Sequence, residues 1–308
     1  MKNKVSKSNP TNFRGVFSAL VTPMKANGDV DHAKLGAVVN HQIRSGIHGL
    51  IPLGSTGEFY ALSSAEREQV IKTTLSAAAG RVPVVAGANA SSTRDVVMFA
   101  RQAEQLGCDG VMLAAPYYSL PTPEELFAHF RAVNNAVGLP IMLYNYPGRT
   151  GVDMKPEFIA RLAALKNVRY VKESTGEMAR MTTLMRLCGD RLAVFCGADA
   201  IALEAFMVGV TGWVGGIANV LPQSHAQLYE LAVVKKDYVR ARKLFFEMLP
   251  AIELIEGGGK YTQWVKAGYG LMGHDCGAPR QPLAAATKAE CATLRQALRQ
   301  SAEGRRKA

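Results

Sequence analysis

Eight short apolar runs recur along this chain, and this repetition constrains the fold more than any other feature. The runs occupy residues 15–23, 46–54, 82–88, 109–116, 139–145, 168–173, 192–198 and 212–217. Segments with helical spacing separate them; one begins with the capping-box pattern Ser63-Ser64 followed by Glu66, and another stops at Gly107. Because the runs start about 20 to 35 residues apart, the size of one strand-helix unit, the pattern predicts a closed (βα)8 TIM barrel.

An open doubly wound sheet is the competing architecture. It would favour a glycine-rich phosphate turn after the first strand, and the sequence at 21–29, VTPMKANGD, is not one. After about residue 222 only helical patterns remain. We therefore predict a barrel core at 12–222 and a C-terminal helical region at 223–302 that packs on the barrel and does not fold independently. The basic ends 1–11 and 303–308 are predicted to be flexible.

Charge and composition exclude several classes of function. Of the formal net charge of +11, most lies in the two ends, and no aromatic-interleaved basic stripe accompanies it, so nucleic-acid binding is not expected. No uncharged apolar run reaches the roughly 18 residues of a membrane span, and the N-terminus lacks the apolar core of a secretory signal. The five cysteines form no CxxC pair and the six histidines no HxxxH pattern. The sequence thus predicts a cytoplasmic enzyme with neither disulfides nor a metal site.

Unusual residues gather where the predicted strands end. They are GSTGE at 54–58, PYY at 116–118, YNYPGRTG at 144–151, Lys172, Asp199 and GGIAN at 215–219. In a barrel of this kind the carboxyl ends of the strands form one face, and chemistry is located there. We therefore expect these residues to lie close together in space.

Each of these residues also has a purely structural interpretation. The glycines of 54–58 could serve positive φ in a turn, or the stretch could form a nest of N–H groups for a carboxylate. Tyr144 could be a core tyrosine, and Arg149 a solvated loop residue. We expect Asp199 to cap the helix that follows it. Gly215-Gly216 could simply make room where the barrel closes.

Lys172 is the hardest residue to explain structurally. It shares one side of its predicted strand with Tyr170 and Ser174, and periodicity alone does not tell whether that side is the barrel interior. If it is, the lysine must be neutral, paired or functional, because burying a charge is costly. A desolvated lysine loses its proton more easily and forms a Schiff base with a carbonyl. Tyr144 ends the preceding strand, so its hydroxyl could relay protons there.

Three motifs in this order resemble a known family. Lys172 in VKEST, Tyr144 in YNYPGRTG and GSTGE after the second strand resemble the dihydrodipicolinate synthase / N-acetylneuraminate lyase family of class I, Schiff-base aldolases. The resemblance extends from about Phe17 to Pro222. It implies a TIM barrel that assembles as a homotetramer, a dimer of dimers, and acts on pyruvate or a larger 2-oxo acid without a metal or organic cofactor.

The resemblance also implies roles for individual residues. Lys172 would form the imine, and Tyr144 would shuttle protons. Tyr118 would reach into a neighbouring subunit and complete a relay Tyr144–Thr56–Tyr118. The residues implied to bind substrate are Gly54, Ser55, Thr56, Arg149 and Val214.

The implied reaction is that of 4-hydroxy-tetrahydrodipicolinate synthases, in which pyruvate condenses with aspartate semialdehyde, an aldehyde co-substrate whose carboxylate suits Arg149. Ser55 stands where synthases usually carry threonine, which leaves open a catabolic aldolase, dehydratase or deaminase acting on a sugar-acid, sialic-acid or hydroxyproline-derived substrate. A non-catalytic ligand-binding barrel is a third hypothesis. Ser64 and Arg67 replace the histidines of lysine-inhibited synthases, so we expect no lysine feedback.

Overall fold

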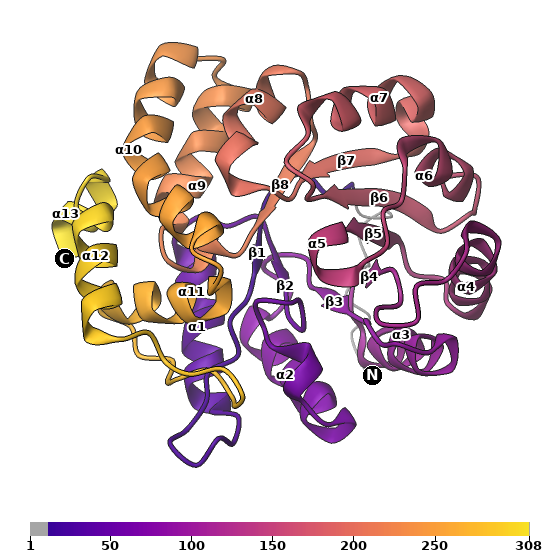
Figure 1. Cartoon of the computed structure of the whole chain (residues 1–308), viewed down its shortest axis with the longest axis horizontal. Helices are drawn as coiled ribbons and strands as arrows, with labels where there is room; N and C mark the ends of the chain where they lie inside the picture. The colour runs from indigo at the N-terminus through magenta and orange to yellow at the C-terminus, as the bar shows by residue number, and fades with distance from the viewer. Residues whose placement is uncertain (1–11, 308) are drawn as a thin grey trace, which may run out of the picture.

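A computed structural model describes residues 12–307, and the predicted flexible end at 1–11 lies outside these residues. Within them, eight parallel strands form a barrel with helices around it (Figure 1). The strands are β1 (Gly15–Ala19), β2 (Gly49–Ile51), β3 (Val85–Gly87), β4 (Gly110–Ala114), β5 (Ile141–Asn145), β6 (Val168–Glu173), β7 (Ala193–Cys196) and β8 (Gly212–Gly215). Each falls inside one of the eight apolar runs, so the prediction of a (βα)8 barrel is confirmed.

The barrel closes between β2 and β3. The hydrogen-bonded order runs β2-β1-β8-β7-β6-β5-β4-β3. A parallel bridge then pairs Leu50 with Val84. Two backbone hydrogen bonds support this bridge: Leu50 N–H donates to Pro83 at 2.9 Å, and Gly87 N–H donates to Pro52 at 2.9 Å. Because closure leaves no long strand edge exposed, the carboxyl ends of all eight strands surround one opening.

The helices between the strands form the outer layer. Their bounds are α1 (His32–Arg44), α2 (Ser64–Ala78), α3 (Thr93–Leu106), α4 (Pro123–Ala136), α5 (Pro147–Thr150), α6 (Pro156–Leu162), α7 (Met178–Cys188) and α8 (Ala202–Met207), with the short 3-10 turns η1 (Phe59–Ala61), η2 (Gly189–Arg191), η3 (Asp199–Ile201) and η4 (Ile217–Asn219). As predicted, a capping box between Ser63 and Glu66 begins α2. Gly107, with φ 92°, is the C-cap of α3. Local sequence therefore fixes both of these ends.

Two apolar layers hold the barrel. The larger one lies between strands and helices, and the smaller one fills the barrel interior. Phe13, Phe17 and Phe195 of the interior layer are almost fully buried, and Phe17 meets Phe195 edge to face with centroids 5.5 Å apart. Each buried aromatic side chain stabilises the fold by roughly 1.5–3 kcal/mol. The interior layer fills the barrel below the carboxyl ends of the strands.

The chain after the barrel is helical, as the sequence predicts. It forms α9 (Pro222–Tyr229), the π-helical turn η5 (Glu230–Val234), α10 (Tyr238–Gly257), α11 (Tyr261–Leu271), α12 (Lys288–Leu298) and α13 (Ala302–Lys307). Figure 1 shows α10 to α13 together on one side of the barrel. Lys266 of α11 forms a buried ion pair with Glu58 after β2. Such a pair anchors the C-terminal helices to the face where the strands end.

The described part of the predicted flexible end at 303–308 is helical. Residues 302–307 form α13, and Glu303 is 7% exposed. The carboxylate of Glu303 accepts hydrogen bonds from the N–H and the hydroxyl of Ser224 at 2.8 and 2.7 Å. These contacts connect α13 to the start of α9. No helix within residues 12–307 is long and apolar enough to cross a membrane.

Candidate active site

Lys172 lies inside the barrel. It pairs with Tyr144 of β5 and Phe195 of β7 in the sheet, and it is 7% exposed. Its neighbour on the same side, Tyr170, belongs to the interior apolar layer, whereas Val171 faces the helices. Its ammonium nitrogen Nζ is 4.3 Å from the centroid of the Tyr144 ring. The structure thus assigns the side of β6 that periodicity left open.

The backbone of the next strand makes room for the lysine side chain. A Cβ atom on Gly197, just after β7, would lie 2.7 Å from Cγ and 2.8 Å from Cε of Lys172, and 1.9 Å from the hydroxyl of Ser174. Real Cβ atoms do not approach this closely, so only glycine fits. Lys172 consequently packs flat against the end of β7.

Burial sets the chemistry of Lys172. Desolvation lowers the pKa of this lysine to about 8, against the attraction of Asp199, Tyr146 and Glu256, which raises it. A group with this pKa carries its free amine in about one molecule in ten at pH 7. A free amine beside a cavity is a nucleophile for a carbonyl carbon.

Tyr144 lies beside the lysine, but its hydroxyl partner differs from the predicted one. Burial raises the pKa of Tyr144 to about 12, and a hydrogen bond with Ser55 opposes this shift. Ser55, and not the predicted Thr56, therefore supplies the hydroxyl next to Tyr144 in this structure. The hydroxyl of Thr56 instead approaches Gly216, where a Cβ atom would lie only 2.7 Å from it. Adjacent residues in a tight turn point in different directions, which the motif alone does not specify.

The turn at 54–58 does not use its glycines as expected. The positive φ values belong to Leu53 (61°) and Glu58 (57°), not to Gly54 or Gly57. Gly57 is needed for close approach, because a Cβ atom there would lie 2.9 Å from the carbonyl oxygen of Leu20. Glu58 tolerates its strained backbone while its carboxylate is paired with Lys266. The turn thus presents Ser55 and Thr56 to the cavity.

Tyr118 does not enter the cavity of its own chain. Its side chain is 97% exposed on a backbone with φ 75°, and the adjacent Tyr117 lines the cavity instead. A relay that includes Tyr118 is therefore not assembled within one chain. Leu120, which is also exposed, follows in the same loop with φ 49°.

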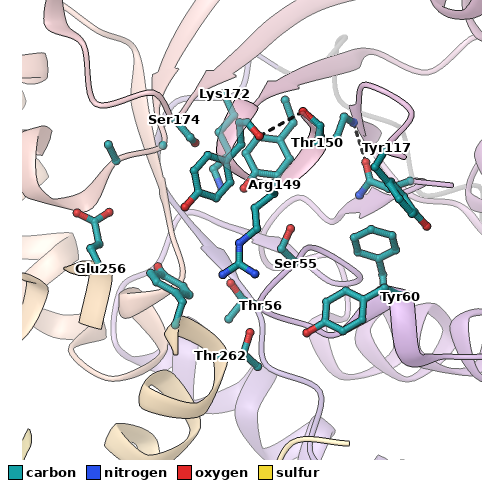
Figure 2. Close-up of a pocket in the computed structure, with 18 of the residues that line it drawn as sticks. Ser55, Thr56, Tyr60, Tyr117, Arg149, Thr150, Lys172, Ser174, Glu256 and Thr262 are labelled. Carbon is teal, nitrogen blue, oxygen red and sulfur yellow. Dashed lines mark hydrogen bonds between the residues drawn. The ribbon is translucent and has the colours of Figure 1, made fainter. Parts of the chain in front are cut away.

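The remaining predicted binding residues divide into two groups. Arg149, in α5, lines the cavity, and Figure 2 shows its guanidinium among the polar side chains. Val214 does not line the cavity but is fully buried in the interior apolar layer. Gly54 is also absent from the cavity wall, and it packs near Met112 and Ala19. The roles of Arg149, Val214 and Gly54 in substrate binding stay predictions.

Asp199 is not a helix cap. Neither η3 nor α8 has a side-chain cap, and the carboxylate of Asp199 accepts hydrogen bonds from Trp213 Nε1 at 2.6 Å and from the Tyr261 hydroxyl at 2.8 Å. Burial and the nearby Glu256 raise the pKa of Asp199 to about 7, and the bonds from Tyr261 and Trp213 oppose that rise. The expectation of a cap was wrong because two aromatic donors, distant in sequence, satisfy the carboxylate.

The C-terminal helices contribute a wall that sequence analysis missed. Glu256 at the end of α10, and Tyr261, Thr262 and Gln263 at the start of α11, line the cavity (Figure 2). The available signal was the glycine run at 257–259, which interrupts a helical pattern. Ser174, just after β6, and Tyr60, in η1, complete the polar lining.

The whole cavity has a volume of about 680 Å³. It combines a nucleophilic lysine, several hydroxyl groups, a guanidinium and the carboxyl group of Glu256. No group of three or more histidine, cysteine, aspartate or glutamate side chains in residues 12–307 could hold a metal ion. The arrangement is suited to covalent capture of a carbonyl compound that bears a carboxylate.

Arg67 fills the space beneath the loops beside this cavity. Its guanidinium lies 3.6 Å from the centroid of Phe99 and donates hydrogen bonds to the carbonyl oxygen of Asn89 at 3.1 Å. Ser64, by contrast, is exposed at the start of α2. The absence of lysine feedback stays a prediction.

Comparison with known proteins supplies the context for this site. The model of the dihydrodipicolinate synthetase family matches residues 12–301. The 4-hydroxy-tetrahydrodipicolinate synthase of Geobacter metallireducens is 38% identical over 289 residues, covering 92% of this chain and 97% of the relative. That of Nitrobacter hamburgensis is 42% identical over 240 residues, covering 78% of this chain and 80% of the relative.

Solved structures agree. A dihydrodipicolinate synthase from Thermotoga maritima superposes with a TM-score of 0.90 at 33% identity, over 94% of this chain and 99% of that one. The chloride-inhibited enzyme from Acinetobacter baumannii, solved as a complex with pyruvate, gives a TM-score of 0.88 at 34% identity, over 93% and 98%. The similarity covers the barrel and the C-terminal helices together.

Proposed function

The chain belongs to the dihydrodipicolinate synthetase family, and from this premise we propose that it condenses pyruvate with aspartate semialdehyde, as a 4-hydroxy-tetrahydrodipicolinate synthase. Relatives with that name cover almost the whole chain. The proposed enzyme is a class I lyase, in which a lysine imine carries the chemistry and no cofactor takes part. The observation that supports this proposal most is Lys172, buried beside Tyr144 with its pKa lowered to about 8.

The proposed first stage is capture of pyruvate. The free amine of Lys172 adds to the carbonyl carbon of pyruvate to give a carbinolamine. Tyr144 then delivers a proton to the leaving hydroxyl, water departs, and a lysine iminium remains. Ser55, which is hydrogen-bonded to Tyr144, is placed to pass protons to and from it.

The proposed second stage forms the carbon–carbon bond. Tyr144, which has given up its proton in the first stage, takes a proton from the methyl group of the bound pyruvate. This leaves an enamine, whose carbon attacks the aldehyde of the co-substrate. Arg149 lines the same cavity and would hold the carboxylate of aspartate semialdehyde through a guanidinium fork. The hydroxyls and N–H groups of the 54–58 turn would hold the carboxylate of pyruvate.

Turnover tests this proposal. We expect the purified protein to consume pyruvate and aspartate semialdehyde together. The rate is measured by coupling the product to the reductase that consumes it. Arg149→Lys should weaken use of aspartate semialdehyde by roughly 10-fold or more, because a point charge replaces a bidentate fork. Arg161→Lys on the exposed side of α6 is the matched control and should change nothing. A folded protein that captures pyruvate yet shows no turnover with aspartate semialdehyde would reject the synthase.

A catabolic enzyme acting on a larger 2-oxo acid is the second candidate. Thr262 and Gln263 add polar groups to the cavity beyond those needed for a short aldehyde, and Ser55 replaces the usual threonine. Cleavage, dehydration or deamination of 2-oxo-3-deoxy sugar acids, of sialic acid or of hydroxyproline-derived acids in the same assay would favour this candidate. A panel without activity would eliminate it.

We also propose that the enzyme is a homotetramer, a dimer of dimers, in which Tyr118 completes a neighbouring subunit's site. The exposure of Tyr118, and its absence from its own cavity, support this arrangement. The names of the relatives support a role in lysine biosynthesis. The free cysteines support a place in the cytoplasm.

Mixing subunits tests the role of Tyr118. Tyr118→Phe and Lys172→Met homomers should each lose most activity, the second completely. Hybrids assembled from both should regain activity, because some sites then combine an intact lysine with an intact partner tyrosine. Hybrids with no more activity than the Tyr118→Phe homomer alone, at confirmed mixing, would contradict donation between subunits.

A further inference from the structure

A hydrogen-bonded network connects the helices after the barrel to the buried lysine. The hydroxyl of Tyr261, the first residue of α11, donates to Asp199 Oδ2 at 2.8 Å and accepts the Gly216 N–H at 3.1 Å. Trp213 Nε1 donates to the other oxygen of Asp199 at 2.6 Å. Both carboxylate oxygens are therefore acceptors, which is the arrangement that stabilises the ionised form.

The position of Tyr261 depends on Gly216, the residue that follows β8. A Cβ atom on Gly216 would lie 2.7 Å from the Tyr261 hydroxyl and 2.7 Å from the Thr56 hydroxyl. A Cβ atom on Gly215 would lie 2.4 Å from Asp199 Oδ1. The glycine pair thus makes room for this network, and not only for closure of the barrel.

A second carboxylate fixes the backbone of the aspartate. Glu256, at the end of α10, accepts the N–H of Asp199 at 2.6 Å and the N–H of Ala200 at 3.0 Å. Asp199 itself is 1% exposed. Two consecutive C-terminal helices therefore hold one buried carboxylate from its backbone and from its side chain.

The proposed chemistry needs a negative charge here. An iminium on Lys172 is a cation in a site that excludes water, and a buried cation without a partner is costly. Of the acids around Lys172, Asp199 acts on it most strongly. We propose that Tyr261 is a positioning residue of the imine site, which holds Asp199 as the counter-ion of the cationic lysine adduct. This inference rests on the proposed function and extends it to the C-terminal helices.

Other charged and titratable groups also face this pair. They are Tyr144 and Tyr146 from β5 and its end, Arg149 from α5, Cys196 from β7, Glu256 from α10 and Tyr261 from α11. Burial and Glu256 raise the pKa of Asp199 to about 7, and the Tyr261 hydroxyl is the largest influence that lowers it. Removal of that hydroxyl raises the pKa of Asp199 further, so a smaller fraction of Asp199 carries a negative charge at neutral pH. Since that charge raises the pKa of Lys172, the pKa of the lysine must then fall.

The test is the pH dependence of pyruvate capture, measured as the rate of borohydride trapping in the full-length protein. In Tyr261→Phe we expect the midpoint of the rate to move to lower pH by about 0.5 to 1 unit, and half-saturation by pyruvate to rise several-fold, roughly 3-fold to 10-fold. Asp199→Asn should shift the midpoint in the same direction. The double variant should shift it no further, because both changes remove one charge. Tyr269→Phe, a buried tyrosine on the same helix, is the matched control and should leave both quantities unchanged.

The possible outcomes distinguish failure of the proposed function from failure of the inference about Tyr261. A wild-type protein that traps no pyruvate would overturn the proposed function and this inference with it. A wild-type protein that traps pyruvate, with the same midpoint in Tyr261→Phe, would overturn the inference alone. Thermal unfolding of each variant shows whether a change is merely structural. If Tyr261→Phe does not fold, the comparison of Asp199→Asn with wild type decides whether a counter-ion is present.

Discussion

At the scale of the residue, the side chain that looked most anomalous in the sequence proves to be the most constrained. Lys172 is enclosed by the Tyr144 ring and by the bare backbone at Gly197, and burial lowers its pKa to about 8. Periodicity could show which residues share its face but not which face is interior. That information comes from closure of the barrel, a property of all eight strands together.

The hydroxyl next to Tyr144 shows what residue-scale prediction leaves open. The sequence identifies the turn that carries Ser55 and Thr56, but the strained backbone at Leu53 and Glu58 decides the direction of each side chain. Ser55 meets Tyr144, while Thr56 meets the Gly216 backbone. A motif therefore specifies which hydroxyl groups are present, and the backbone geometry specifies which partner each of them meets.

Two substitutions distinguish these hydroxyls. Ser55→Ala should lower kcat by roughly 10-fold to 100-fold, the loss of a buried hydrogen bond of about 1–3 kcal/mol in the proton relay. Because the Ser55 hydrogen bond lowers the pKa of Tyr144, its removal should also move the basic limb of the pH profile to higher pH. Thr56→Val keeps the shape of the side chain and should act mainly on KM for pyruvate. Steady-state kinetics with varied pH measures both, and a larger loss of kcat in Thr56→Val than in Ser55→Ala would contradict this assignment.

At the scale of the element, the positions of the strands could be predicted from the sequence. The docking of the C-terminal helices on the barrel could not. Apolar runs flanked by turn residues define β1 to β8, and capping residues define the ends of α2 and α3. The C-terminal helices were predicted as helices, yet their contribution to the site was missed. Their docking depends on partners far apart in sequence, such as Lys266 with Glu58 and Tyr261 with Asp199. Periodicity within a helix carries no information on such pairs.

The expected helix cap at Asp199 illustrates the same limit. An aspartate just before a helical pattern is typically a cap, because its carboxylate satisfies the first free N–H groups. Here Glu256 satisfies the N–H groups of Asp199 and Ala200 from another helix, which frees the aspartate for Trp213 and Tyr261. A local rule thus gives way where a distant element supplies the same hydrogen bonds.

At the scale of the whole molecule, the barrel and the C-terminal helices form one site between them. The strands supply the lysine and its tyrosine, and α10 and α11 supply Glu256 and Tyr261. The family match covers both parts, residues 12–301. The position of Tyr118, outside its own cavity, extends the proposed site to a second chain. A site divided in this way would couple folding of the C-terminal helices, assembly and catalysis.

The central claim is that Lys172 captures pyruvate as an imine. Its most direct measurement is trapping by borohydride in the presence of pyruvate, followed by intact-mass analysis and peptide mapping, with Lys172→Met as the control. We expect one reduced pyruvate adduct per chain on Lys172, none in the variant, and a trapping rate that rises with pH through about 8 as the amine loses its proton. A folded protein that gives no adduct, or an adduct on a different lysine, would contradict imine formation on Lys172 and favour a barrel that binds its ligand without covalent capture.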